Sequence, residues 1–283
     1  MIPLTDLGLA QYFEFAGGLY PNGKNSRPLA HENAGVTLAA TVEPVDRDGE
    51  SSTSGKVGMI CIGMSNAARE FSQFIRLTDT DARKNPHLAM VNAALNGADA
   101  TQLSDPGGSY WKYVERQIQH CAITSAQVQV VWLKTALAHE QRAFPEKARL
   151  LQGALRSIVG TLKTKFPQLK LVYLSSRTYG GYSETDLSPE PIAYESAFAV
   201  KWLIEEYINN DSPDGSIPWV SWGPYLWANG LTPRRDGLSW VRGDFDSDGV
   251  HPSAQGALKV ATMLLEFFES DAPAQRWFFS KPH

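Results

Sequence analysis

A serine in the first quarter of this chain and an aspartate–histidine pair near its end have the residue types and surroundings that nucleophilic chemistry requires. Ser65 follows the apolar run Val57 to Ile62, which has the length and composition of a buried strand, and it precedes a segment that can form a helix. Ligands of α/β sheets bind at the carboxyl ends of strands, where a helix N-terminus also offers free N–H groups. Ser65 is therefore a candidate nucleophile, although serine is also an ordinary helix-capping residue.

Asp248 and His251 stand three positions apart in a glycine-containing turn, just before an apolar periodic segment. A serine nucleophile needs a base that takes its proton, and the imidazole needs an acid that fixes its tautomer and stabilises its cation. One short loop can supply both groups. The alternative is an aspartate that closes the turn beside an incidental loop histidine. Ser65, His251 and Asp248 together form a candidate catalytic triad.

The two stretches, GMSN at 63–66 and DGVHPS at 248–253, resemble the SGNH (GDSL-type) hydrolase superfamily, in particular its carbohydrate-esterase branches. The first stretch differs from the G-x-S-x-G elbow of α/β-hydrolases, because residue 67 is alanine. The resemblance covers roughly residues 56 to 268. It implies a flavodoxin-like three-layer α/β/α sandwich with about five parallel strands, and ester hydrolysis without a cofactor.

The resemblance also implies an oxyanion hole formed by the backbone N–H groups of Ser65 and Gly97. Glycine suits this position because a backbone without a Cβ can approach the reacting carbonyl closely. The superfamily usually carries G-x-N-D after the third strand, whereas this chain reads KTAL at 134–137 and lacks the asparagine donor. Either two N–H groups suffice or another side chain replaces the asparagine. The candidates for that replacement are Asn66, Asn96, Lys134 and Thr135.

Arginine and aromatic residues cluster after the fourth and fifth expected strands, where a substrate cleft would open. The candidates for substrate binding are Arg177, Tyr179, Trp222, Tyr225 and Trp227. Aromatic faces suit sugar rings, although core packing explains most tryptophans. We expect a small acyl group, such as acetyl, on a carbohydrate as the substrate. The alternatives are a non-catalytic carbohydrate-binding protein on the same fold and a lipase or simple-ester esterase.

Metal and nucleotide sites are poorly supported by the sequence. The stretch DFDSDG at 244–249 begins like a calcium-binding EF-hand loop, but position twelve is Gln255 instead of the expected glutamate. The segment GMSNAA at 63–68 has one glycine and no following lysine, so it gives poor support for a phosphate-binding loop. We expect no metal and no cofactor.

Composition and charge are those of an ordinary soluble globular protein. The chain has 283 residues, of which 43% are hydrophobic, and a net charge of −4, so neither nucleic acid nor a membrane is an expected partner. The start lacks the features of a signal peptide, although Met1 could stand where a secretory or periplasmic leader was removed. Cys61 and Cys121 are expected to be free thiols.

Strand-like and helix-like segments alternate from residue 56 onward, which favours a parallel sheet covered by helices on both faces. The expected strands are 57–62, 87–94, 127–133, 169–175 and 217–222, and the clearest helices are 147–165, 191–209 and 257–268. Residues 1–55 are expected to form an irregular extension packed on a hydrolase domain of residues 56–283. Within that extension, Gly35 to Val45 has the composition of a strand.

Overall fold

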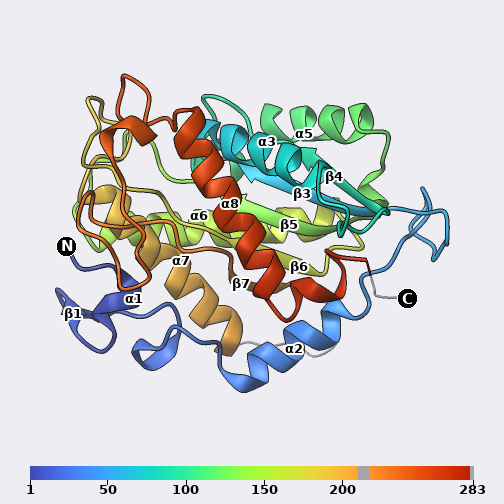
Figure 1. Cartoon of the computed structure of the whole chain (residues 1–283), viewed down its shortest axis with the longest axis horizontal. Helices are drawn as coiled ribbons and strands as arrows, with labels where there is room; N and C mark the ends of the chain where they lie inside the picture. The colour runs from blue at the N-terminus through green and yellow to red at the C-terminus, as the bar shows by residue number, and fades with distance from the viewer. Residues whose placement is uncertain (210–216, 281–283) are drawn as a thin grey trace.

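A five-stranded parallel sheet forms the centre of the protein in the computed structural model, which describes residues 1–209 and 217–280 (Figure 1). In spatial order its strands are β4 (Leu88–Asn92), β3 (Val57–Gly63), β5 (Val128–Lys134), β6 (Leu171–Leu174) and β7 (Trp219–Trp222). Every neighbouring pair is parallel. The predicted α/β class with five parallel strands is confirmed.

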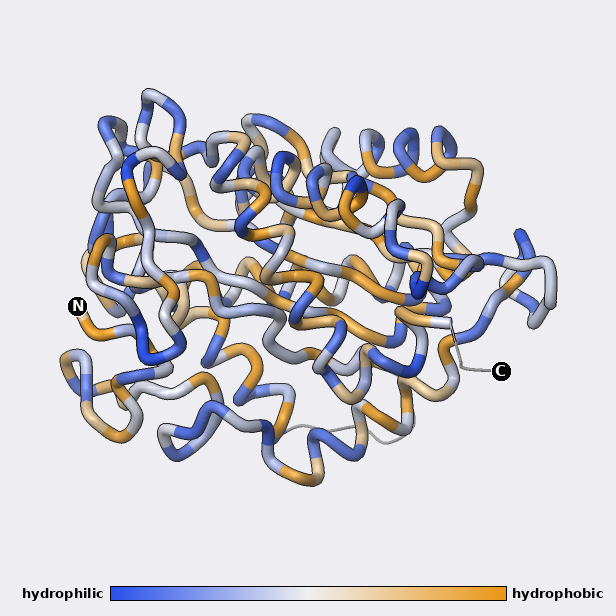
Figure 2. The backbone as a smooth tube through the Cα atoms, in the orientation of Figure 1, coloured by the Kyte–Doolittle hydropathy of each residue, from blue (hydrophilic) through white to orange (hydrophobic). Residues whose placement is uncertain are grey.

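The central strands are apolar along nearly their whole length because both faces of the sheet are covered. In β3 the side chains alternate between two cores: Ile60 and Ile62 point to one, and Met59 and Cys61 point to the other. Figure 2 shows the apolar strands running through the middle of the molecule, with hydrophilic positions gathered toward its outside. The continuous apolar runs in the sequence therefore correspond to doubly covered strands.

Helices cover the two faces of the sheet in separate layers. One core joins the sheet to α2 (Leu29–Ala39), α3 (Ser65–Asp79) and α8 (Ala254–Ser270). The other core joins it to α5 (Ser109–His120), α6 (Glu146–Lys165) and α7 (Ile192–Asn209). The remaining short helical elements after β3 in the chain are α4 (Ala100–Leu103), η2 (Ser125–Gln127), η3 (Arg242–Asp244) and η4 (Ala274–Arg276). The result is a three-layer sandwich.

Residues 1–39 lie against the β7 side of the sandwich, residues 43–47 contact the start of β5, and this N-terminal part contains more regular structure than its sequence suggests. It forms α1 (Leu4–Leu7), the short hairpin β1 (Gln11–Tyr12) with β2 (Phe15–Ala16), the turn η1 (Pro21–Gly23), and α2. The strand expected at Gly35 to Val45 is wrong, because residues 35–39 belong to α2. A Cβ on Gly35 would lie 2.5 Å from the ring of Trp219, so this glycine lets the helix pack closely on β7.

The order of the core strands fixes where a ligand can bind. In chain order they run β3, β4, β5, β6, β7, and in space β3 lies between β4 and β5. This is the flavodoxin-like order, whose switch point lies between the first and third strands. A ligand is therefore expected beyond the carboxyl ends of β3 and β5. Among residues 1–209 and 217–280, no helix is long and apolar enough to cross a membrane.

Candidate active site

Ser65 is the first residue of α3 and lies immediately beyond the carboxyl end of β3. The turn into the helix depends on Gly63, because a Cβ there would lie 2.2 Å from the carbonyl oxygen of Lys134 on the neighbouring strand. As the first helical residue, Ser65 has no backbone partner four residues earlier within α3, and its N–H points out of the helix end. The serine therefore combines a hydroxyl with the N–H groups of a helix N-terminus.

His251 belongs to a loop that is closed on itself just before α8. Phe245 and Pro252 pair as an antiparallel bridge at the base of this loop. Gly249 has a φ of +67°, and a Cβ at this position would lie 1.7 Å from the carbonyl oxygen of Tyr182. Only glycine combines that backbone conformation with so close an approach. The loop geometry presents His251 at a fixed position.

A side chain from α3 ties this loop to the serine. The amide nitrogen of Asn66 donates a hydrogen bond of 2.8 Å to the carbonyl oxygen of Val250, which is adjacent to His251. Asn66 is buried, and its Oδ1 atom has no hydrogen-bond partner among the described residues. Asn66, which follows Ser65, therefore helps to position Val250, which precedes His251.

Ser65, His251 and Asp248 form one continuous line of hydrogen bonds. Ser65 Oγ lies 2.7 Å from His251 Nε2, and His251 Nδ1 lies 2.5 Å from Asp248 Oδ2. An ionised carboxylate only accepts hydrogen bonds, so it holds the imidazole proton on Nδ1 and leaves Nε2 free to accept the serine proton. This is the arrangement that activates a serine hydroxyl.

The Asp248 carboxylate is held in its ionised form. Its Oδ1 atom accepts the backbone N–H groups of Val250 at 2.9 Å and of His251 at 3.0 Å. Burial alone would raise the pKa of Asp248, but the hydrogen bonds from the His251 ring and from these N–H groups outweigh it and lower the pKa to about 2. Asp248 is therefore ionised in the folded protein at neutral pH.

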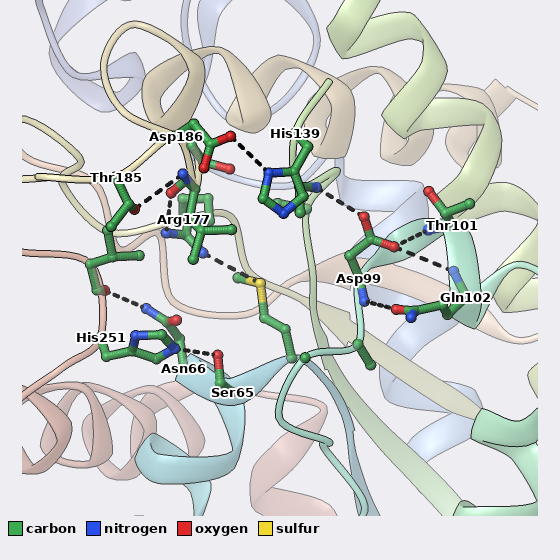
Figure 3. Close-up of a pocket in the computed structure, with 18 residues that line it drawn as sticks. Ser65, Asn66, Asp99, Thr101, Gln102, His139, Arg177, Thr185, Asp186 and His251 are labelled. Atoms are coloured by element: carbon green, nitrogen blue, oxygen red, sulfur yellow. Dashed lines mark hydrogen bonds and ion pairs between the residues drawn. The ribbon is translucent and has the colours of Figure 1, made fainter. Parts of the chain in front are cut away.

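A pocket of about 710 Å³ opens beside Ser65 and His251, at the switch point of the sheet. Loops after β3, β4, β5 and β6 contribute to its walls, as Figure 3 shows. Small apolar side chains, Ala98, Ala136 and Ala138, line part of it. Most other side chains that line it carry polar groups, including Asn66, Asp99, Gln102, Arg177 and Thr185. The pocket is large enough for a sugar-sized ligand.

Gly97 lines the same pocket, in the loop between β4 and α4. Its φ is +79°, a left-handed conformation that favours glycine, and a Cβ on it would meet no atom within 4 Å. Asn96 instead lines a separate hollow with Arg69, and Thr135 lines no wall of the serine pocket. Of the expected oxyanion donors, Ser65, Gly97 and Asn66 border the pocket.

Lys134 does not supply an oxyanion donor, nor is it a solvated lysine at a strand end. Its side chain is completely buried, and its amine lies 2.6 and 2.7 Å from the two carboxylate oxygens of Glu70 on α3. Burial lowers the pKa of Lys134 and raises that of Glu70, and each charge partly offsets the effect on the other. The ion pair links β5 to α3, the helix that begins with Ser65.

The aromatic residues expected at the substrate are engaged elsewhere. Trp222 donates to the carbonyl oxygen of Leu19, and the hydroxyl of Tyr225 accepts the N–H of Leu4; both aromatic residues line a second cavity beside the N-terminal segment. Trp227 is fully buried. None of the three lines the serine pocket, because their rings pack β7 and its following loop against neighbouring elements.

Tyr179 also lies outside the serine pocket, packed against the rings of Tyr182 and Trp227. Of the five substrate-binding candidates, Arg177 is the one that lines the pocket. It follows β6 and reaches the same space as the residues after β3. The loop after the fourth core strand therefore contributes a cation instead of an aromatic face.

Several polar residues of the pocket were not singled out from the sequence. His139 Nδ1 lies 2.9 Å from Asp186 Oδ2 at the exposed rim. Asp99 caps α4 and also accepts the N–H of Ala138 at 3.0 Å (Figure 3). Asp99 and His139 follow β4 and β5 in the chain, so their position just after two core strands was the available signal.

The three aspartates of the stretch 244–249 have different partners. Asp244 accepts from the amine of Lys259 at 2.9 Å, Asp246 pairs with Arg69, and Asp248 holds His251. In the part of the chain that the structure describes, no group of three or more His, Cys, Asp or Glu residues could hold a metal. Both cysteines are free thiols, with Cys61 buried and Cys121 exposed.

The sheet order, the serine after the first core strand and the Asp-x-x-His loop before the last long helix occur together in one sandwich. The fold is SGNH hydrolase-like. No protein-family model matches the chain, and no curated protein matches it significantly.

Similar solved structures include a Bacteroides fragilis protein described as an acylhydrolase (12% identity, 89% of this chain and 100% of that one, TM-score 0.47). An acetyl-xylooligosaccharide esterase from Geobacillus matches at 15% identity over 79% of this chain and 97% of its own, with a TM-score of 0.45. The catalytic domain of a Streptococcus pneumoniae peptidoglycan O-acetyltransferase matches at 13% identity over 76% and 94%, with a TM-score of 0.41.

Proposed function

We propose that the protein is a serine ester hydrolase that removes small acyl groups from a carbohydrate. The observation that carries the proposal is the unbroken line from Ser65 Oγ to His251 Nε2 at 2.7 Å and from His251 Nδ1 to Asp248 Oδ2 at 2.5 Å, beside an open pocket. A non-catalytic carbohydrate-binding protein would have no need for this alignment. The reaction needs no cofactor.

The proposed reaction has two steps. His251 takes the proton of Ser65 while Ser65 Oγ attacks the ester carbonyl, and His251 then gives that proton to the departing alcohol oxygen. Water, deprotonated by the same imidazole, attacks the acyl carbonyl and breaks the acyl–serine bond, and the imidazolium returns the proton to Ser65 Oγ as the acid is released. The N–H groups of Ser65 and Gly97 are the proposed oxyanion donors, and Asn66 borders the same space. Because the base must be neutral, activity should fall when the medium is made acidic.

The character of the pocket supports a short acyl group on a hydroxylated molecule. Ala98 and Ala136 line the same pocket as Ser65 and are small enough to leave room for an acyl group, and many of the other lining side chains can form hydrogen bonds. Such side chains can form hydrogen bonds with sugar hydroxyls.

The direct test is hydrolysis of p-nitrophenyl acetate by the wild type and by Ser65→Ala. We expect the variant to lose at least about 1,000-fold in kcat/KM while its thermal unfolding stays close to that of the wild type. The matched control is Ser72→Ala, which makes the same change two turns further along α3, where Ser72 Oγ accepts a hydrogen bond from Asn92. Equal activity in Ser65→Ala and the wild type would refute the proposal.

The substrate class is tested separately, with acetylated oligosaccharides compared against p-nitrophenyl esters of increasing chain length. We expect release of acetate from the sugar esters and declining turnover as the acyl chain grows. A preference for long acyl chains would replace the carbohydrate assignment with a lipid one and leave the serine mechanism intact.

A further inference from the structure

Arg177 is a buried cation in the wall of the proposed active site whose hydrogen bonds are largely unmet. The residue is only 5% exposed. Its Nη1 group faces the sulfur of Met64 at 3.3 Å, and its Nη2 group reaches the carbonyl oxygen of Leu187 at the long distance of 3.5 Å. Its Nε atom is buried and has no partner among the described residues. A guanidinium has five N–H donors, so this one has unused capacity.

The acids near Arg177 are already engaged with other groups. Glu70 is held by Lys134, and Asp248 is held by His251. Glu190 accepts the N–H of Gly180 and the indole N–H of Trp227. These carboxylates interact electrostatically with Arg177, yet within the described ranges none forms an ion pair with it at 4 Å or less. A buried charge without a direct partner is costly, and the described residues supply no direct partner for Arg177.

The position of Arg177 in the pocket indicates which part of an ester substrate it would contact. In the proposed reaction His251 must reach the departing alcohol oxygen, so the alcohol part of the substrate lies on the imidazole side of the scissile bond. Figure 3 shows Arg177 above His251 and Asn66, across the pocket from Asp99 and Gln102. The charge of Asp248, behind the imidazole, also acts on Arg177. The guanidinium therefore faces the alcohol part.

We propose that Arg177 binds a carboxylate on the alcohol part, so that the substrate is an acylated acidic sugar, such as an O-acetylated uronic acid. This inference rests on the proposed function and specifies its substrate. The planar fork of a guanidinium matches a carboxylate in two parallel hydrogen bonds. The hydroxyl oxygens of a neutral sugar can accept from the guanidinium, but they leave its charge without a counter-charge. The nearby acids Asp99 and Asp186 favour a ligand group with a single negative charge over a doubly charged phosphate.

The test compares acetate release from a monoacetylated methyl glucuronoside and from the corresponding methyl glucoside. The wild type should prefer the acidic sugar by about 10- to 100-fold in kcat/KM, the size expected for charged hydrogen bonds. Arg177→Met should bring that ratio close to one, and Arg177→Lys should restore part of it. The control Arg76→Met changes an exposed arginine on α3 and should keep the wild-type ratio.

Three outcomes would overturn the inference: no preference for the acidic sugar in the wild type, an unchanged ratio in Arg177→Met, or an equal loss on both sugars, which would indicate a purely structural arginine. Binding measured by calorimetry on Ser65→Ala separates this inference from the proposed function. Methyl glucuronoside should bind more tightly than methyl glucoside, even if the wild type hydrolyses no ester. Tighter binding of a methyl glucoside phosphate would make the anion a phosphate and refute the carboxylate.

Discussion

The acid of the proposed triad, Asp248, is the residue for which geometry gives the sharpest expectation. Its two oxygens hold the ring nitrogen of His251 and the backbone of the same loop. In Asp248→Asn the amide can present its NH₂ group to Nδ1, which favours the tautomer with the proton on Nε2. We therefore expect kcat for p-nitrophenyl acetate to fall by about 10³- to 10⁴-fold with little change in KM. A loss below tenfold would contradict the assignment of Asp248.

The pKa of about 2 for Asp248 also predicts how this residue affects stability. A carboxylate whose folded pKa lies below its unfolded value, about 3.9, contributes stability that is complete above the unfolded value and is lost as the pH falls toward the folded one. The difference in free energy of unfolding between the wild type and Asp248→Asn should therefore shrink as the pH falls from about 4 toward 2. Urea denaturation over this range measures it, and a difference that grows below pH 4 would contradict the prediction.

Single residues differ in how far the sequence reveals them. The proximity of Ser65, Asp248 and His251 could be predicted because each belongs to a short local pattern, and the structure brings the two patterns together. The burial of Lys134 could not be predicted, because its partner Glu70 lies 64 positions earlier on another element. In retrospect, Glu70 lies on the inward face of α3 with Ala67 and Phe74, and an acid on an apolar face is a sign of a buried partner.

At the scale of elements, the Glu70–Lys134 pair ties α3, which carries the serine, to β5. Glu70→Gln should destabilise the protein by about 3–5 kcal/mol, because it leaves the buried amine without a counter-charge. The double variant Glu70→Gln/Lys134→Met should be more stable than the single variant, since it removes that amine as well. Urea denaturation of both variants is the measurement.

The control for this prediction is the more exposed pair between Glu115 and Lys165, at 3.6 Å. Glu115→Gln should cost less than about 1 kcal/mol, because solvent screens such pairs. If the double variant proved less stable than Glu70→Gln, the buried pair would not be the source of the loss.

Elements were predictable where their hydrophobic pattern had a single explanation. The runs that became β3 and β5 are apolar because both sheet faces are covered, and α6 carries a regular apolar stripe. Helix α2 was missed because Val36 and Thr37 are β-branched and favour strands locally. Its packing on β7 through Gly35 decides its structure, and that contact joins residues far apart in the chain.

At the scale of the whole molecule, residues 1–39 stabilise the edge of the sheet that ends with β7. Arg27 pairs with the buried carboxylate of Asp271 at 2.5 Å and hydrogen-bonds Ser221 Oγ at 2.7 Å. The indole of Trp219 donates to the carbonyl oxygen of His31, and Lys201 donates to the backbone of Gly17. Polar groups of β7, α7 and the segment after α8 thus depend on residues 1–39 for their partners.

Removal of residues 1–39 should therefore prevent stable folding, because it uncovers the aromatic side chains of β7 and leaves Asp271 buried without its cation. Far- and near-ultraviolet circular dichroism with limited proteolysis would show it. The control removes only Met1 and Ile2, which are exposed, and should unfold like the full chain. A compact, cooperatively unfolding 40–283 fragment would contradict this prediction.

The proposed nucleophile, Ser65, and its proposed base, His251, lie 186 positions apart, on α3 and on the loop that leads into α8, and these two helices pack against each other. A chain still emerging from the ribosome carries Ser65 for most of its synthesis without an imidazole to accept the proton. Ester cleavage would thus begin only when the final helix docks. During refolding, the rate at which esterase activity returns would therefore report the rate at which α8 docks. Circular dichroism could already show the native helix content before that step.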